Sequence, residues 1–301
     1  MTGDCFGDKT ASQNHINHMD ESNFLPNQNI AILGLGLIGG SIAMGLRGHC
    51  RSILGVDNDP LTCQIATTKG IVDAASEDIR QILPQADILI IATPVSAALE
   101  IIAALPSIHD GSKLIVMDVT STKVQIMQTF ESLPSNFDII GGHPLCGKEK
   151  LGICNAEKEM LYGATFTLTA SVRTTERTKS LALELVKAIG CKPFWIDAKT
   201  HDHNLAATSH APHLLAVALT NATEKEYARL SGGGLSSATR LASTPTSMML
   251  SMVMTNAENT ISKLRETQAE IDRIIALMES GDEERFATLL DESRAKREEM
   301  M

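Results

Sequence analysis

The sequence predicts a doubly wound α/β domain followed by an all-α domain, and three observations support that prediction. Short apolar segments alternate with helical patterns through the first two thirds of the chain. A glycine-rich turn follows the first of these segments, at residues 34–39. Strand patterns end near residue 199, and only helical patterns follow. Strands that alternate with helices form parallel sheets through right-handed crossovers, which places helices on both faces of the sheet.

The expected strands are short apolar runs that glycine, aspartate or proline brings to an end. Residues 29–35 form the first run, which is continuously apolar, as in a strand buried on both faces of a parallel sheet. Helical patterns cover residues 38–47 and 175–189. The further strands are expected at residues 53–57, 87–92, 113–118, 138–142, 165–169 and 193–197.

The all-α half begins with a helical pattern at residues 200–229, in which Pro212 marks a kink or a new start. A flexible glycine-rich break at 231–234 follows, and Thr244 and Pro245 are expected to open the next helix. From there an apolar stripe runs through residues 249–278, about 50 Å at the rise of an α-helix. A helix of that length is longer than a compact domain of about 100 residues is wide. We therefore expect a homodimer that buries the stripe, with packing inside one chain as the alternative.

Composition and charge exclude several classes of protein. The 301 residues are 43% hydrophobic and 21% charged, which is enough for two domains with cores of their own. A formal net charge of −10 argues against nucleic-acid and anionic-membrane partners. No apolar run reaches the roughly 18 residues of a membrane span. The six cysteines include no CxxC pair, which indicates reduced thiols in a cytoplasmic protein.

These patterns divide the chain into three segments. A polar N-terminal tail at 1–28 is expected to be disordered, and it lacks the apolar centre of a signal peptide. His15 and His18 lie in this tail, where metal binding is the alternative to a solvated segment. Residues 29–198 are expected to form a nucleotide-binding domain. Residues 199–301 are expected to form a helical domain for substrate binding and dimerisation.

The glycine-rich turn matches the pattern GxGxxG at residues 34–39. It joins a buried strand to a helix, and Asp57 ends the next strand, so the motif predicts a Rossmann-type dinucleotide site. The N-terminus of the helix offers free N–H groups to a pyrophosphate. Asp57 would bind ribose hydroxyls and repel a 2′-phosphate, which favours NAD over NADP; a glycine turn without a cofactor is the alternative. The expected cofactor contacts are Gly34, Gly36, Leu37, Ile38, Gly39, Asp57, Thr93 and Pro94.

His143 is the candidate general base. It lies between a strand end and Pro144, at the edge of the sheet where ligands bind in such folds. The ordinary pKa of histidine suits proton transfer near neutral pH, and a purely structural histidine is the alternative. Ser121, which follows the preceding strand, would bind the same substrate hydroxyl or orient the imidazole. Lys123 would neutralise an anion or would only hold its loop.

The helical half contributes two histidines and an arginine. His210 and His213 are three residues apart and therefore share a helix face. Metal binding would require a third ligand such as Glu149 or His143, and the sequence holds no HExxH pattern, so we expect no metal. Arg240 follows the glycine-rich break and suits a substrate carboxylate, which a guanidinium binds through two parallel hydrogen bonds. A solvated arginine is the alternative.

Together these motifs resemble the prephenate/arogenate dehydrogenase family of tyrosine biosynthesis. The matching segments are GLGLIGGS at 34–41, DVTSTK at 118–123, GGHPLCGKEKLG at 141–152, SHAPHLLA at 209–216 and GGLSSATR at 233–240. They follow the order of the family and span residues 29–280. Two segments depart from its usual pattern: HPMAG is HPLCG here, and Phe-Arg-Asp is Leu235-Ser236-Ser237. The first departure is a modest change in the lining of the pocket, and the second bears on fine substrate preference but not on the reaction.

The resemblance implies oxidative decarboxylation of prephenate to 4-hydroxyphenylpyruvate by an NAD-dependent homodimer, with arogenate as the alternative substrate. It implies that His143 accepts the proton of the ring hydroxyl, that Ser121 lies beside it and that Arg240 binds a carboxylate. Two other classes stay open. A β-hydroxyacid dehydrogenase would carry a lysine base in the helical domain, and residues 205–220 contain no lysine. A non-enzymatic NAD-binding sensor would not require the full set of site residues.

The resemblance also implies that His210 and His213 line the substrate site and that Glu149 lies close to it. Because the substrate is a dianion, Lys123, Arg240 and the histidines are expected to create a local positive potential within an acidic protein.

Overall fold

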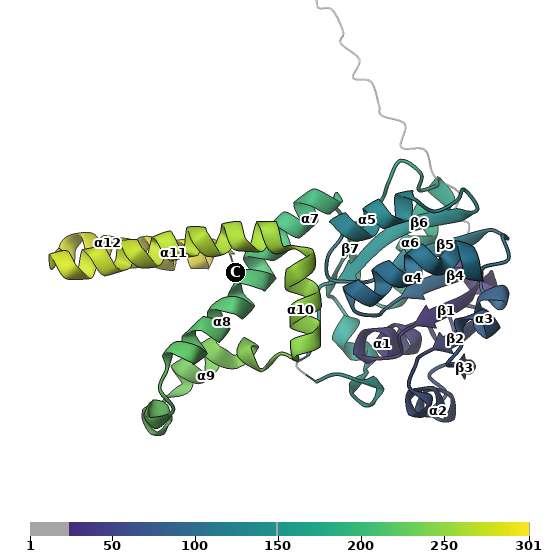
Figure 1. Ribbon diagram of the computed structural model, residues 1–301, viewed down its shortest axis with the longest axis horizontal. Helices are drawn as coiled ribbons and strands as arrows, with labels where there is room; N and C mark the ends of the chain where they lie inside the picture. Colours follow the sequence, from purple (N-terminus) through teal and green to yellow (C-terminus); the bar gives the residue numbers. More distant parts are fainter. Residues whose placement is uncertain (1–23, 149, 301) are drawn as a thin grey trace, which may run out of the picture.

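The computed structural model describes residues 24–148 and 150–300, which form a sheet-containing domain and a helical domain (Figure 1). Residues 1–23, which include His15 and His18, lie outside the described residues, as does Glu149. The expectations for the tail at 1–23 and for Glu149 therefore stay predictions.

Eight strands form one sheet, in the order β3-β2-β1-β4-β5-β6-β7-β8. The strands pair in parallel, except that β6 and β7 are antiparallel. Every predicted strand is present, whereas β3 was not predicted because its three residues are too few for a periodic pattern. The bounds are β1 Asn29–Leu33, β2 Ser52–Val56, β3 Ala74–Ser76, β4 Ile88–Ile91, β5 Leu114–Asp118, β6 Phe137–Pro144, β7 Thr165–Thr169 and β8 Lys192–Trp195.

Helices cover both faces of the sheet, which confirms the predicted fold class (Figure 1). Alternate residues of β1 enter two separate cores: Ile30 and Ile32 pack with α1 and α6, while Ala31 and Leu33 pack with α4 and α5. This alternation explains why the strand has to be apolar at every position. The helices of this domain are α1 Leu37–Leu46, α2 Pro60–Thr68, α3 Ile79–Ile82, α4 Val95–Ile108, α5 Val124–Glu131 and α6 Glu176–Ala188.

The helical domain extends away from the sheet, and α11 and α12 form its far end (Figure 1). Among the described residues, no helix combines the length and the hydropathy that a membrane crossing needs. The helices of the helical domain are α7 Ala198–Leu205, α8 Ala211–Ala222, α9 Gly233–Thr239, α10 Thr246–Thr255, α11 Ala257–Ser280 and α12 Glu283–Met300.

Short 3-10 turns occur in both domains, at Leu25–Asn27, Leu83–Gln85, Ile153–Asn155, Lys158–Leu161, Lys225–Leu230 and Arg240–Ser243.

Residues 24–28, which we assigned to the disordered tail, are ordered. Leu25 is buried in the core of the sheet domain. The backbone N–H groups of Phe24 and Leu25 both donate to the carboxylate of Glu184 on α6, at 2.9 Å. The tail prediction failed here because these contacts are long-range, and a polar composition does not reveal them.

The helix predicted at 200–229 is divided into separate pieces. A π-helical turn at Ala206–His210 separates α7 from α8, and α8 ends at Ala222. Pro212 accounts for the irregularity, since it has no N–H group to donate to the carbonyl of Thr208 four residues earlier. The glycine-rich break is also shorter than predicted, because α9 already begins at Gly233.

The long apolar stripe does not belong to a single helix. Asn256 adopts φ −131° and ψ 35°, and this residue separates α10 from α11. Helix α10 begins at Thr246, one residue after the predicted proline. Asn256 is buried, and its side-chain amide donates to the carbonyl of Asp202 at 2.6 Å. A polar side chain with a buried partner thus ends α10 where the apolar stripe predicted a continuous helix.

Candidate active site

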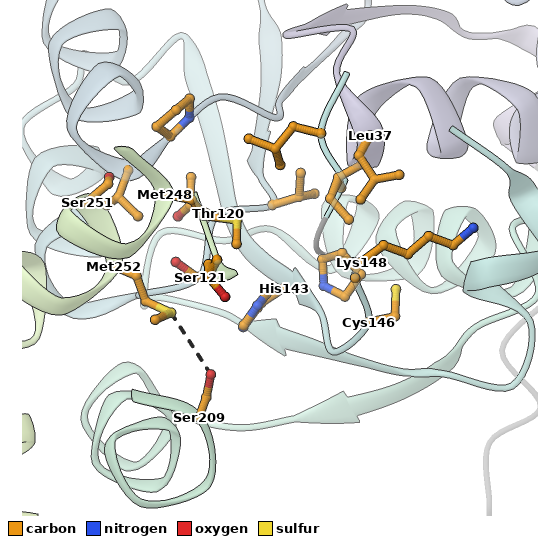
Figure 2. A pocket seen from close by; sticks show the side chains of 18 of the residues that line it. Leu37, Thr120, Ser121, His143, Cys146, Lys148, Ser209, Met248, Ser251 and Met252 are labelled. Carbon is orange, nitrogen blue, oxygen red and sulfur yellow. Dashed lines mark hydrogen bonds between the residues drawn. The ribbon is translucent and has the colours of Figure 1, made fainter. Parts of the chain in front are cut away.

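A cavity of about 680 Å³ lies between the two domains. It opens at the carboxyl ends of β1, β4, β5 and β6, and helices α8 and α10 close its other side. The order of the strands reverses between β1 and β4, which is the place where ligands bind in doubly wound sheets. Figure 2 shows Ser121 and His143 at the centre of this cavity, with Met248 and Met252 on one side and Lys148 on the other.

The glycine turn is shaped for close approach of the backbone. Gly34 has φ +90°, and a Cβ atom there would lie 2.7 Å from the carbonyl oxygen of Ala92. A Cβ atom on Gly39 would lie 1.9 Å from the carbonyl oxygen of Gly34, so α1 packs directly on the turn. At Gly36, in contrast, a Cβ atom would meet nothing within 4 Å. Open space beside the first N–H groups of α1 fits a pyrophosphate.

The other expected cofactor contacts surround this turn. Leu37, Ile38, Thr93 and Pro94 line the cavity, whereas Asp57, which directly follows β2, is not among the lining residues. The carboxylate of Asp57 accepts a hydrogen bond from the N–H of Leu35 at 2.8 Å, which fixes it against the glycine turn. The structure therefore brings together the residues that a dinucleotide site needs.

His143 lies on β6 and faces the cavity from a partly buried position. Burial lowers the pKa of His143 well below its ordinary value, and the neighbouring His201, Lys123 and His210 lower it further. The imidazole is therefore neutral near pH 7 and can accept a proton. Ser121, in the loop between β5 and α5, also lines the cavity.

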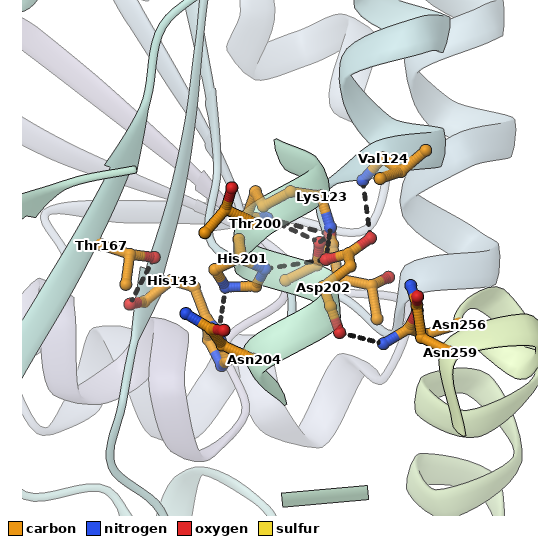
Figure 3. Close-up of polar contacts among 12 residues, drawn as sticks. Lys123, Val124, His143, Thr167, Thr200, His201, Asp202, Asn204, Asn256 and Asn259 are labelled. Atoms are coloured by element: carbon orange, nitrogen blue, oxygen red, sulfur yellow. Dashed lines mark hydrogen bonds and ion pairs between the residues drawn. The ribbon is translucent and has the colours of Figure 1, made fainter. Parts of the chain in front are cut away.

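Two residues that the sequence analysis did not identify lie directly behind His143. Its Nδ1 is 3.0 Å from Nε2 of His201, and Nδ1 of His201 is 2.7 Å from Oδ1 of Asp202 (Figure 3). His201 and Asp202 are neighbours on α7 and both are buried. No sequence motif marks the pair, because it meets His143 only through the contact between the two domains.

His210 and His213 line the cavity from the helical domain. The side-chain amide of Asn259 donates a hydrogen bond to the amide oxygen of Asn256. The amide nitrogen of Asn256 is therefore the atom that faces Nδ1 of His210, at 3.1 Å. Nδ1 of His210 is therefore an acceptor, and Nε2 carries the proton. Burial lowers the pKa of His210 to about 4, so this neutral form persists at pH 7. Its Nε2 is buried and has no partner among the described residues, which leaves it for a ligand.

Two cationic side chains line the cavity, Lys148 and Arg240. Lys148 pairs with Glu157 at 2.5 Å, and both side chains are partly exposed. Arg240 begins the 3-10 turn Arg240–Ser243. Among the described residues that line the cavity, none is a carboxylate. The charged side chains among the described lining residues are therefore both cationic, within a protein of net charge −10.

Lys123 is a correction to the predicted substrate site. Its side chain is fully buried, it does not line the cavity, and its Nζ forms an ion pair with Asp118 of β5. Nζ also donates to Oγ1 of Thr120 at 3.2 Å and to the carbonyl of Thr122 at 3.1 Å. Lys123 therefore holds the loop between β5 and α5, which is the alternative that the sequence left open. His143 and His210, whose pKa values burial lowers, likewise contribute no positive charge, so the cations of the lining are Arg240 and Lys148, whose role was not predicted.

The chain is similar to known proteins over most of its length. Two family models match the chain: prephenate dehydrogenase, nucleotide-binding domain, at residues 42–194, and prephenate dehydrogenase, dimerization domain, at residues 197–292. The prephenate dehydrogenase of Lactococcus lactis subsp. cremoris (strain MG1363) is 32% identical over 282 residues, which are 90% of this chain and 77% of that protein.

Two crystal structures extend the likeness to the whole fold. Prephenate dehydrogenase from A. aeolicus, in complex with hydroxyphenyl propionate and NAD+, superposes with a TM-score of 0.84 and 27% identity, over 92% of this chain and 100% of that one. Synechocystis arogenate dehydrogenase has a TM-score of 0.77 and 26% identity, over 91% and 100%. The chain belongs to the prephenate dehydrogenase family.

Proposed function

We propose that this chain catalyses the NAD-dependent oxidative decarboxylation of prephenate to 4-hydroxyphenylpyruvate in tyrosine biosynthesis. The observation that carries the proposal is that one cavity is lined by a neutral histidine, His143, by the N-terminus of α1 and by two cationic side chains, Lys148 and Arg240. This reaction requires a proton acceptor, a dinucleotide-binding site and a site for an anionic substrate.

In this reaction Nε2 of His143 accepts the proton of the ring hydroxyl, and Ser121 binds the same oxygen. NAD, when bound, supplies the acceptor for the hydride that leaves the hydroxyl-bearing carbon. The bond to the ring carboxylate breaks, and its electron pair completes the aromatic ring as carbon dioxide departs. The imidazolium of His143 then returns a proton to the phenolate oxygen. The protein contributes position and one proton transfer, and general-base catalysis is typically worth about 10²–10⁴-fold.

The remaining cavity residues bind the substrate. Arg240 and Lys148 suit its two carboxylates, and His210 offers a fixed Nε2–H to a substrate oxygen. His213 donates from Nδ1 to the carbonyl of Ser209 at 2.8 Å, which turns its other ring nitrogen away from that carbonyl. Prephenate carries a keto group where arogenate carries an ammonium. Lys148 and Arg240 would repel that ammonium, which supports prephenate as the preferred substrate.

The proposal includes a homodimer that forms through the helical domain. Ile271, Ile275 and Met278 lie on one face of α11 and are 46%, 47% and 64% exposed. The match to a dimerization-domain family supports pairing of this face with a second copy. We place the enzyme in the cytoplasm, since the five cysteines among the described residues are free thiols.

The direct test is a steady-state assay of NADH absorbance with prephenate and arogenate, each combined with NAD and NADP. We expect the highest kcat/KM for prephenate with NAD. A higher value for arogenate would reassign the substrate, and a higher value for NADP would contradict the role given to Asp57. Absence of turnover with all four pairs would refute the proposed function.

A further inference from the structure

We propose that His201 and Asp202 are a positioning pair that sets the tautomer of His143, so that its Nε2 presents a lone pair to the substrate hydroxyl. The inference rests on the proposed function, in which His143 is the proton acceptor. It assigns a role to two buried residues of the helical domain that the reaction itself does not touch.

Asp202 can only accept hydrogen bonds in its present position. Its Oδ1 is 2.7 Å from the backbone nitrogen of Lys123, and its Oδ2 is 2.8 Å from the backbone nitrogen of Val124. A backbone N–H can only donate, so both carboxylate oxygens are acceptors. These are the amides of the N-cap residue and of the first residue of α5, so the carboxylate also caps that helix across the domain boundary (Figure 3).

The fixed carboxylate sets the direction of the next bond. Nδ1 of His201 must donate to Oδ1 of Asp202, at 2.7 Å. The proposal takes the His201 ring to carry this one proton, which leaves the lone pair on Nε2, 3.0 Å from Nδ1 of His143. His201 is fully buried, so water does not compete for either nitrogen. The proton of neutral His143 is therefore held on Nδ1, and Nε2 is left as the acceptor on the cavity side.

This arrangement matters because a neutral imidazole has two tautomers, and only one of them has a lone pair on the nitrogen that faces the cavity. Without His201, the proton would be free to sit on Nε2, where it would block acceptance of the substrate proton. When Nε2 takes that proton, the imidazolium donates from Nδ1 to His201, which in turn donates to the Asp202 carboxylate. The pair therefore also offsets part of the cost of a positive charge formed in a buried site.

The test compares two substitutions of His201 with a control on the same helix. In His201→Met the acceptor for Nδ1 of His143 is lost. In His201→Gln an amide oxygen can take the place of Nε2 and restore the acceptor. His203 is exposed on the same helix, so His203→Met is the matched control. All variants are made in the full chain and are checked for thermal stability and NAD affinity.

Two readouts are measured. The first is ¹⁵N NMR of the histidine rings, with the His143 signals identified by their loss in His143→Asn. We expect protonated Nδ1 and unprotonated Nε2 in the parent protein and in His201→Gln, and a shift toward protonated Nε2 in His201→Met. The second is turnover of prephenate with NAD. We expect kcat to fall roughly 10- to 100-fold in His201→Met, the usual effect of removing a partner that orients a functional histidine, and to recover in part in His201→Gln.

A parent protein with Nε2 of His143 protonated at neutral pH would overturn the inference, as would an unchanged kcat in a folded His201→Met. If His201→Met does not fold, the ring spectrum of the parent protein decides alone. If the parent protein folds but shows no turnover of prephenate, the proposed function fails, and the spectrum still decides the tautomer.

Discussion

His143 and His210 present different groups to the same cavity although both are neutral imidazoles. Asn256 donates to Nδ1 of His210 and so places the proton of that ring on Nε2. At His143, which also lines the cavity, the Nδ1 nitrogen faces His201, and in our proposal the opposite nitrogen is the one offered to the substrate. Burial is the main reason that neither ring is charged, because it is the largest cause of both lowered pKa values. One histidine is thus suited to accept a proton and the other to donate a hydrogen bond.

The lowered pKa of His143 gives a prediction for the pH dependence of turnover. The base works in its neutral form, so activity is lost as the pH falls through its pKa. Because burial, together with His201, Lys123 and His210, moves this pKa well below 6.5, kcat/KM for prephenate should stay level from pH 7.5 to below pH 6.5. A profile in buffers of constant ionic strength checks this. A half-maximal value at or above pH 6.5 would contradict the proposed environment of His143.

Arg240 gives a second prediction for a single residue. If it binds a substrate carboxylate, Arg240→Gln should raise KM for prephenate roughly 10- to 150-fold, the effect of losing about 1.5–3 kcal/mol of charge-assisted hydrogen bonding. Arg240→Lys should recover only part of the loss, because an ammonium restores the charge without the planar fork. Affinity for NAD is the internal control and should not change. An unchanged KM in Arg240→Gln, with a raised KM in Lys148→Gln, would show that Lys148, and not Arg240, binds the substrate carboxylate.

The loop between β5 and α5 depends on an ion pair inside the protein. Lys123 and Asp118 are both fully buried, and removal of one partner leaves the other as a buried charge. Lys123→Met should therefore reduce the free energy of unfolding by about 3–5 kcal/mol. Lys179→Met removes an exposed pair with Glu176 and should cost less than about 1 kcal/mol. Urea unfolding of both variants makes the comparison; equal stability of Lys123→Met and the parent protein would restore Lys123 as a candidate substrate ligand.

The elements that could be predicted from sequence are those whose signal is local. The apolar run of β1 and the glycine turn after it are such cases, because the nearby backbone restricts which residue type fits at each position there. The break at Asn256 could not be predicted, since its cause is a buried contact with Asp202 on a distant helix. The same limit applies to the site: His143 was found from its place at a strand end, whereas His201 reaches it only after the two domains pack together.

The arrangement of the two domains places the cavity at their boundary. Asp202 caps α5 across that boundary, and the hydroxyl groups of Thr122 and Thr255 are 2.9 Å apart. The N–H of Ser96 at the start of α4 donates to the hydroxyl of Ser251 at 3.2 Å. These contacts tie the two halves of the cavity together, which favours a fixed geometry for the groups that line it.

Assembly of two chains gives a prediction for the whole molecule. The exposed apolar face of α11 should be buried between two copies, because an isolated face of this kind is costly in water. Light scattering of the parent protein at micromolar concentration should give the mass of two chains. The double substitution Ile271→Glu and Ile275→Glu should give the mass of one chain, while Glu270→Gln and Asp272→Asn on the same helix serve as controls. A parent protein with the mass of one chain would contradict the proposed dimer.

The most direct measurement of the central claim compares the parent protein with His143→Asn in the presence of prephenate and NAD. NADH is followed by absorbance, 4-hydroxyphenylpyruvate is identified by chromatography, and NAD affinity is measured separately. We predict that the parent protein forms both products in equal amounts. We predict that His143→Asn binds NAD as the parent does but loses about 10²–10⁴-fold in kcat, since proton transfer alone is removed. A folded His143→Asn protein with near-parental kcat would show that His143 is not the base.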